Sequence, residues 1–257
     1  MTGAGRGVRP RAEIAIERPG RAPLRRRTLL SGGRNGMEEF DLSLMFDSHC
    51  KFWWDNETCS LIDVQPVGMV RLPSGRIVVQ GPGWRSGPEV EHLDVTVPPG
   101  DYPVTLSISE WNPAPVPDIS SPMRRVNAAR IGVIDEPVVS WELAFHAGRA
   151  GGEANDEVFD GFSVDSGTGC FFDASARHVV ERIQHDGSAL EEAMLRVLDV
   201  GGIEVSSCDR RFNVVVFKCG MGDGGYRTWI GRTGRGEVAC FVADLELLRH
   251  SVGFERV

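Results

Sequence analysis

Two glycine-rich segments, residues 161–173 and 220–226, hold the residues whose types and spacing suit chemistry. In each segment a carboxylate stands in a turn whose glycines leave backbone N–H and C=O groups uncovered. Carboxylate and carbonyl oxygens suit a hard cation, and uncovered N–H groups suit a polar ligand. The candidate ligand-binding residues, including one arginine from an earlier strand pattern, are Asp165, Thr168, Asp173, Asp223, Tyr226 and Arg125.

A metal site is one interpretation of these aspartates. If strand ends meet at one edge of a sheet, Asp165, Asp173 and Asp223 converge there, with Asp244 as a further candidate. Such a group of oxygen ligands would bind Ca²⁺ or Mg²⁺. The long separations along the chain do not decide the matter, so this metal site is a hypothesis.

Two arginines in the strand pattern of residues 125–134 bear on the same site. Arg125 and Arg130 are five residues apart and are expected to face opposite sides of a strand. One would be exposed. The other, if it points inward, needs a carboxylate partner, for which Asp165 or Asp223 is the candidate.

Residues 164–168, Val-Asp-Ser-Gly-Thr, match the loop that carries the aspartate of aspartic proteases. Those enzymes pair two such loops. The chain has no second Asp-Thr/Ser-Gly, so a pepsin-like site is excluded and a retropepsin-like one would need a homodimer. The segment also resembles the phosphate loop of sugar kinases and actin-like ATPases, but their alternating strands and helices are not expected here. The remaining alternative is a structural turn in which Asp165 accepts local N–H bonds.

Six cysteines give no sign of a metal site or a disulfide framework. There is no Cys-x-x-Cys pair, and His49, Cys50 and Cys59 have no fourth ligand at zinc-site spacing. No export signal is visible, so we expect a cytoplasmic protein with reduced thiols. Cys170, Cys219 and Cys240 are expected to be small buried side chains.

The charge balance favours a basic partner over nucleic acid. The 257 residues carry a net charge of −8, but residues 1–36 hold nine arginines and two glutamates. The other 221 residues therefore have 19 basic and 34 acidic side chains, a net charge of −15. A body this acidic repels phosphate backbones and suits a basic protein or a cation. No apolar run approaches the roughly 18 residues of a membrane span.

The arginine-rich head and the rest of the chain differ in pattern. Residues 1–36 have no apolar periodicity, and Met37 opens the first patterned segment. We interpret residues 1–36 as a disordered or spuriously translated extension, and residues 37–257 as one domain.

Hydrophobic periodicity predicts an α+β fold that consists mainly of antiparallel β-sheet, as a sandwich or a partly open barrel. Residues 69–72 and 76–79 flank Pro-Ser-Gly and predict a hairpin in which Gly75 takes positive φ. One helical pair comes late, at residues 176–185 and 188–200, and the second helix starts with a Ser188–Glu191 capping box. Further strands are predicted at 92–97, 102–109, 125–134, 138–146, 213–217 and 237–242.

Tryptophans divide into two groups by context. Trp141 and Trp229 lie in strand patterns and are expected in the core. Trp53, Trp54 and Trp84 lie among polar and glycine residues, which is typical of a pocket or an interface.

A series of motifs runs in order from residue 67 to residue 248, comprising residues 68–77, 97–104, 125–130, 164–173, 220–226, 229–231 and 236–238. This series resembles a bacterial family known only as domain of unknown function 4241. The chain departs from the family by Gln80-Gly81-Pro82, where Asp-Pro is common, and by Ser166, where alanine is frequent. The resemblance therefore implies that Ser166 is not a nucleophile. Since the family has no established activity, it implies a shared fold and site without naming a reaction.

Together these patterns favour a binding or interaction module that uses the two Gly-Asp loops. Its ligand would be a small molecule or a basic protein, and one form of it is an acidic inhibitor or immunity-type protein. The competing hypothesis is a metal-assisted hydrolase that uses Asp165 and Asp223. Whether the carboxylates converge in a concave pocket discriminates between the two.

Overall fold

The computed structural model describes residues 41–55, 58–82, 91–111, 123–148, 160–178, 180–181, 188–207 and 210–257. The arginine-rich head, Trp84 and Cys208 lie outside the described residues. The described part is a mostly antiparallel β-structure of two sheets with few helices, as the hydrophobic periodicity predicted. No helix among the described residues is long and apolar enough to span a membrane.

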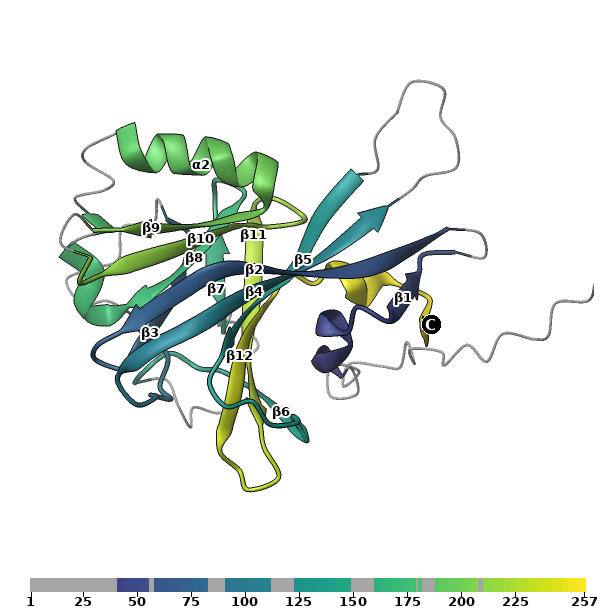
Figure 1. Ribbon diagram of the computed structural model, residues 1–257, viewed down its shortest axis with the longest axis horizontal. Helices are drawn as coiled ribbons and strands as arrows, with labels where there is room; N and C mark the ends of the chain where they lie inside the picture. Colours follow the sequence, from purple (N-terminus) through teal and green to yellow (C-terminus); the bar gives the residue numbers. More distant parts are fainter. Residues whose placement is uncertain are drawn as a thin grey trace, which may run out of the picture.

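The larger sheet has nine strands and curls into a half-barrel. In Figure 1 the long strands β2 and β4 run side by side across the molecule, and β11 and β12 cross them at a steep angle. In spatial order its strands are β13 (Gly253–Arg256), β1 (Cys50–Trp53), β2 (Cys59–Leu72), β4 (Gly100–Trp111), β5 (Met123–Gly132), β12 (Val238–Asp244), β11 (Gly224–Arg232) and β6 (Ser140–Leu143), and β7 (Phe162–Val164) pairs separately with β11.

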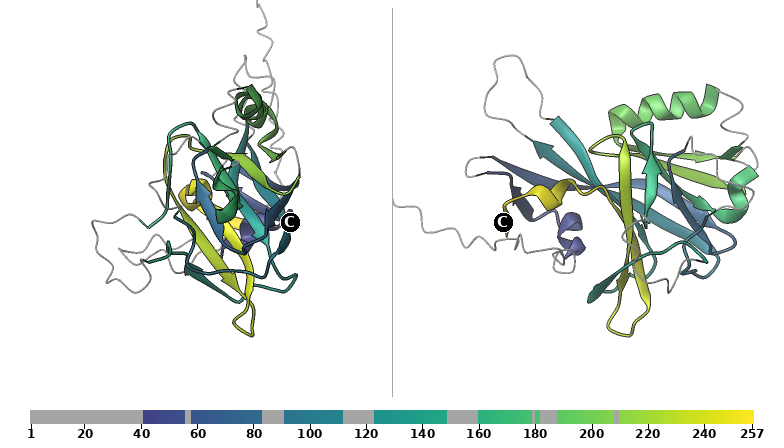
Figure 2. Two further views of the ribbon diagram at one scale, coloured as in Figure 1. Left: turned by 90° about the vertical axis from the view of Figure 1, so that its left-hand side faces the viewer. Right: turned by 180° about the vertical axis from the view of Figure 1, so that it is seen from behind.

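The smaller sheet has four strands and is covered on one side by the helix α2 (Ser188–Val200). Figure 2 shows α2 lying over β9 and β10 from behind as well. Val197 of α2 is fully buried against this sheet. The strand order is β3 (Ile77–Gln80), β8 (Thr168–Asp173), β10 (Asn213–Lys218) and β9 (Gly202–Ser206).

The turn at residues 73–76 does not close the predicted hairpin. Gly75 has a positive φ of 69°, and its N–H donates to Leu72 O, so the turn itself forms. However, β2 pairs with β1 and β4, whereas β3 pairs with β8 in the other sheet. A Cβ on Gly75 would stand 1.9 Å from Val97 O. The hairpin prediction was wrong because this turn connects β2 of the larger sheet to β3 of the smaller one, and it packs against Val97.

Apolar side chains from both sheets form the largest core cluster. It joins Leu106 and Ile131 of the nine-stranded sheet to Val79, Phe171 and Val215 of the smaller one, all nearly fully buried. Burial of such side chains stabilises the fold by roughly 1.5–3 kcal/mol each. β10 and β12 are buried on both faces, because successive side chains along each strand pack alternately into this cluster and into another one.

A polar clasp also joins the two sheets where β2 bulges between Pro66 and Gly68. Glu204 of β9 accepts bonds from the Met69 N–H and from Asn213 Nδ2, at 3.1 and 2.8 Å. Burial alone would raise the pKa of Glu204, but these hydrogen bonds lower it. A side chain at Gly68 would place its Cβ 2.5 Å from Glu204 Oε2. The glycine is therefore required for the clasp to close.

Other predicted elements have mixed outcomes. The second helix of the pair is confirmed as α2. Of the first, residues 177, 178, 180 and 181 are helical, Ala176 ends a 3-10 turn, and residues 179 and 182–185 lie outside the described residues. The strand predicted at 92–97 is wrong, because this segment makes only one isolated bridge, Leu93 to His146. Short 3-10 turns form η1 (Leu42–Phe46), η2 (Ala174–Ala176) and η3 (Leu247–His250).

Candidate functional site

The two Gly-Asp segments lie side by side. Val164 at the end of β7 pairs with Gly224 at the start of β11. Thr168 at the start of β8 pairs with Lys218 at the end of β10. Both ladders are antiparallel, so the turns that link these strands, residues 164–168 and 218–224, meet at one place. We call this pair of turns the double turn.

Hydrogen bonds donated by backbone N–H groups connect the two halves of the double turn. The Gly167 N–H donates to Asp223 Oδ1 at 2.8 Å, and the Cys219 N–H donates to Gly167 O at 2.8 Å. Gly167 and Gly222 take φ of 63° and 89°, which side chains disfavour. The uncovered N–H groups expected to hold a ligand are therefore partly used inside the protein.

Two of the candidate ligand-binding side chains are structural. The Tyr226 hydroxyl donates to Gly222 O at 2.7 Å, and burial raises the pKa of this tyrosine to about 12. Thr168 is buried, and its hydroxyl shares a 2.9 Å hydrogen bond with Ser166. Both side chains fix the shape of the double turn from within.

Asp165 and Asp223 occupy the next pair of positions beyond the β7–β11 ladder, so they are neighbours. Both residues are exposed. Asp223 binds the Gly167 N–H, as a turn-capping carboxylate does, whereas Asp165 has no hydrogen bond with a described residue. Neither makes an ion pair with any residue that the structure describes. The double turn thus carries two neighbouring carboxylates that form no ion pair with a described residue.

Asp173 is not part of this group. It lies five residues from Thr168 at the other end of β8, about 16 Å away at the rise of a β-strand. Its buried carboxylate accepts bonds from Ser74 N (2.9 Å), Ser74 Oγ (2.8 Å) and Ser175 N (2.8 Å). It therefore secures the turn that passes the chain between the sheets. The three proposed metal ligands do not converge, because β8 holds Asp173 apart from the other two.

Asp244 is also held elsewhere. It is fully buried at the end of β12, where burial raises its pKa, and Arg249 Nε pairs with its Oδ2 at 2.6 Å. In the part of the chain that the structure describes, no three His, Cys, Asp or Glu side chains gather as metal ligands would.

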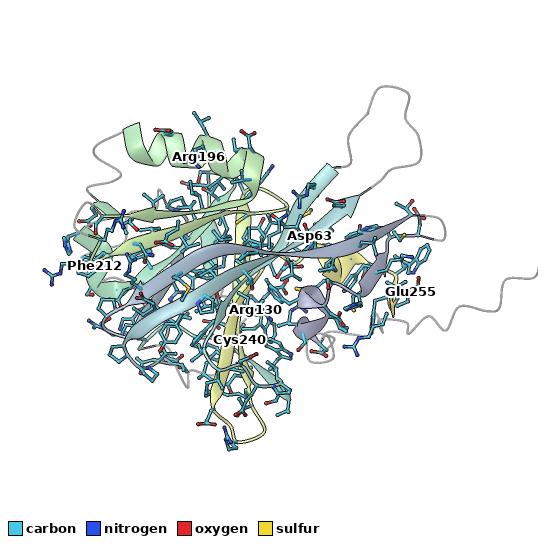
Figure 3. The ribbon with its side chains drawn as sticks, in the orientation of Figure 1. Asp63, Arg130, Arg196, Phe212, Cys240 and Glu255 are labelled. Atoms are coloured by element: carbon cyan, nitrogen blue, oxygen red, sulfur yellow. The ribbon has the colours of Figure 1, made fainter. Side chains whose placement is uncertain are left out.

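The two arginines do not pair with the aspartates of the double turn. Arg125 Nη1 donates to Gly220 O at 3.0 Å, and its buried Nε lacks a hydrogen bond. Arg130, labelled near the middle of the molecule in Figure 3, stacks over Phe46 with 4.3 Å between its guanidinium carbon and the ring centroid. The expectation that the inward arginine needs a carboxylate was wrong, because a backbone carbonyl of the double turn takes that place. Arg125 therefore stabilises the double turn through its hydrogen bond to Gly220 O.

A cleft of about 650 Å³ lies away from the double turn, further along β11. No sequence pattern indicates this cleft, because its walls come from β6, β11, η1, η3 and the irregular segment 91–95. Trp141 and Trp229, expected in the core, are both wall residues, although Trp229 is only 7% exposed. The polar and aromatic side chains that line the cleft include Asp94, Trp141, Glu142, Phe145, Trp229 and Arg249.

Comparison with known proteins gives a family and no activity. The model of a family described as a protein of unknown function (DUF4241) matches residues 70–243. No curated protein and no solved structure matches the chain. The match covers the smaller sheet, most strands of the larger sheet and both halves of the double turn, so the resemblance in motifs is confirmed over most of the described residues.

Proposed function

The chain belongs to the DUF4241 family, and we propose that this member is a binding module that holds a basic protein partner on its double turn, as an acidic inhibitor does. The observation that carries the proposal is the pair of neighbouring carboxylates, Asp165 and Asp223, that no described cation neutralises. Two like charges placed together repel, and a cation brought between them relieves that repulsion.

The surroundings of this pair support a protein ligand. Met221, at the tip of the double turn, is 55% exposed and offers an apolar contact next to the two carboxylates. The hydrogen bonds of Gly167, Cys219 and Tyr226 hold the turn in one shape before binding. A rigid loop loses little conformational entropy on association, which favours affinity.

Charge and thiol state support the same proposal. The net charge of −8 attracts a basic partner over a distance and raises the association rate at low salt. Cys170 and Cys219 are buried free thiols, in keeping with the reducing cytosol proposed as the compartment.

The competing proposal, a metal-assisted hydrolase at the same aspartates, has less support. Hydrolysis through a metal needs several ligands and an open position for water. Asp165 and Asp223 supply two carboxylates, one of which already accepts the Gly167 N–H, and Asp173 is about 16 Å from Thr168 along β8.

A labelled hexa-arginine peptide tests the proposal in a form that needs no natural partner. Exposed ion pairs contribute up to about 1 kcal/mol each, so the double substitution Asp165→Asn, Asp223→Asn should weaken peptide binding by about tenfold at low salt. Fluorescence anisotropy of the full chain measures this. Asparagine keeps an acceptor for the Gly167 N–H, so the turn should keep its shape.

The matched control removes the same charge elsewhere. Glu192 and Asp199 are exposed on α2, and Glu192→Gln, Asp199→Asn should change the peptide affinity less than twofold. Equal weakening by both double variants would show that only the overall charge acts, and would overturn the proposal.

A further inference from the structure

The cleft along β6 and β11 is a second candidate site, independent of the double turn. β6 pairs with β11 so that Leu143 lies opposite Trp229 and Trp141 lies opposite Gly231. The segment 91–95 closes one side, because the Asp94 N–H donates to Phe145 O at 2.9 Å. A volume of about 650 Å³ falls within the usual range of small-molecule sites.

Aromatic side chains supply much of the wall. Trp141, Phe145 and Trp229 all line the cleft. The Trp141 indole is fixed at one end, since its Nε1 donates to Asp41 Oδ1 at 3.2 Å. Such rings offer flat, apolar faces with negative potential, which bind flat ligands and organic cations.

One lining charge is uncompensated. Arg249 is neutralised by the buried Asp244, and Glu142 by Arg232, whose Nε is 2.9 Å from Glu142 Oε1. Asp94 is half-buried, makes no hydrogen bond or ion pair through its side chain with any described residue, and has a buried Oδ1. A buried carboxylate oxygen without a partner is unfavourable, so its retention points to a partner that comes from outside.

A second polar atom of the wall also lacks a partner. Trp229 is more than nine-tenths buried, and its Nε1 donates to no acceptor in the described structure. An unmade hydrogen bond of this kind costs about 1–3 kcal/mol. An acceptor atom on a ligand would remove that cost.

The wall already holds one organic cation from the protein itself. The Arg249 guanidinium carbon lies 5.2 Å from the centroid of the Trp229 ring. We propose that the cleft binds a small aromatic amine, with its ammonium group at Asp94, its ring against Trp141 and Phe145, and an oxygen that accepts the Trp229 N–H. This ligand matches the lining in charge, shape and hydrogen bonding, and the proposal does not depend on the function of the double turn.

Four matched compounds test the ligand class on the unmodified full chain. Tyramine has all three features, phenethylamine lacks the oxygen, 4-propylphenol lacks the charge, and 3-(4-hydroxyphenyl)propionate reverses it. Calorimetry should rank tyramine first, phenethylamine several-fold weaker, and 4-propylphenol at least tenfold weaker, with no binding of the propionate. Binding of 4-propylphenol or of the propionate as tight as that of tyramine would overturn the proposal. So would the lack of saturable tyramine binding at millimolar concentration.

Substitutions locate the site. Asp94→Asn should weaken tyramine binding at least tenfold, and Trp141→Leu should weaken it several-fold through the lost ring face. Asp199→Asn on α2 is the charge-matched control and should leave the affinity unchanged. Because the Asp94 side chain has no partner among the described residues, Asp94→Asn should melt at the same or a higher temperature. An unchanged tyramine affinity in both cleft variants would contradict the assignment.

Discussion

Strand β11 takes part in two regions that treat polar groups in opposite ways. At its start β11 adjoins the double turn, where Gly167 and Cys219 find partners inside the chain and the nearby Tyr226 hydroxyl donates to Gly222 O. Near its middle, Trp229 lines a cleft in which the Trp229 N–H and one oxygen of Asp94 have none. About 17 Å of strand separates Gly224 from Trp229.

The conspicuous glycine motif and the unpartnered polar groups therefore lie in different regions of the molecule. Glycines with positive φ and a nearby aspartate form a conspicuous motif because the backbone there must turn tightly. In the double turn, several of the backbone N–H groups donate hydrogen bonds inside the protein and are not available to a ligand. The unpartnered groups of the cleft, on Asp94 and Trp229, lie outside the two Gly-Asp segments and more than a hundred residues apart along the chain.

The largest expected effect tests whether the double turn is architectural. A Cβ at Gly220 would lie 2.2 Å from Val126 O, whereas one at Gly222 meets nothing within 4 Å. Gly220→Ala should therefore lower the free energy of unfolding by about 3 kcal/mol. Gly222→Ala should lower it by only about 1 kcal/mol through its positive φ. Urea unfolding measures both, and equal small losses would show that the β5 contact tolerates displacement.

The next effect separates a structural aspartate from an available one. Asp173→Asn replaces an oxygen that accepts from serine donors with an NH₂ group, so stability should fall by about 2 kcal/mol. Asp165→Asn changes an exposed side chain that has no partner among the described residues, so stability should stay within about 0.5 kcal/mol of the wild type. Thermal melts compare the two variants. A large loss for Asp165→Asn would mean that this carboxylate belongs to the fold.

A smaller effect concerns Tyr226 in alkali. Burial raises its pKa above the usual 10, to about 12, so the neutral phenol stabilises the fold at pH below 10. The unfolded chain ionises first, and stability is lost as pH rises from 10 to 12, by about 2 kcal/mol. Tyr226→Phe should be about 1 kcal/mol less stable at neutral pH but lose less between pH 10 and 12. Denaturant unfolding at both ends of this window gives the answer, and parallel pH profiles would refute the role of Tyr226.

The smallest effect concerns divalent cations. With only Asp165 and Asp223 side by side, millimolar Ca²⁺ should raise the melting temperature by less than about 1 °C, because one or two exposed carboxylates contribute little. Asp165→Asn with Asp223→Asn should remove even that shift. A rise of several degrees that Asp173→Asn abolishes would instead establish the three-aspartate metal site predicted from the sequence.

Much of the fold was predictable, since period-two apolar alternation shows which strands have one buried face. The alternation at residues 102–109 lies within β4, and the strand-like runs at 125–134, 213–217 and 237–242 coincide with β5, β10 and β12. The assignment of strands to sheets was not predictable at the 73–76 turn. The same Pro-Ser-Gly sequence serves a hairpin or a crossing, and the choice depends on Asp173, about a hundred residues later.

The site was predictable only in part. The pairing of the two Gly-Asp segments follows from strands that end in glycine turns, and it brought Asp165 and Asp223 together. The role of Asp173 could not be read from its residue type, because a carboxylate held by two serines looks the same in sequence as a free one. Asp94 and Trp229 could not be paired in advance, because the segment 91–95 has no regular structure to position it.

The double turn and the cleft should bind their ligands independently, and a competition titration distinguishes two separate sites from one shared site. Hexa-arginine affinity is measured with and without saturating tyramine on the same full-length chain. Since the peptide is assigned to the double turn and the amine to the cleft, we expect saturating tyramine to change the peptide dissociation constant less than twofold. A competitive weakening that grows with tyramine concentration would place both cations at one site and contradict the account.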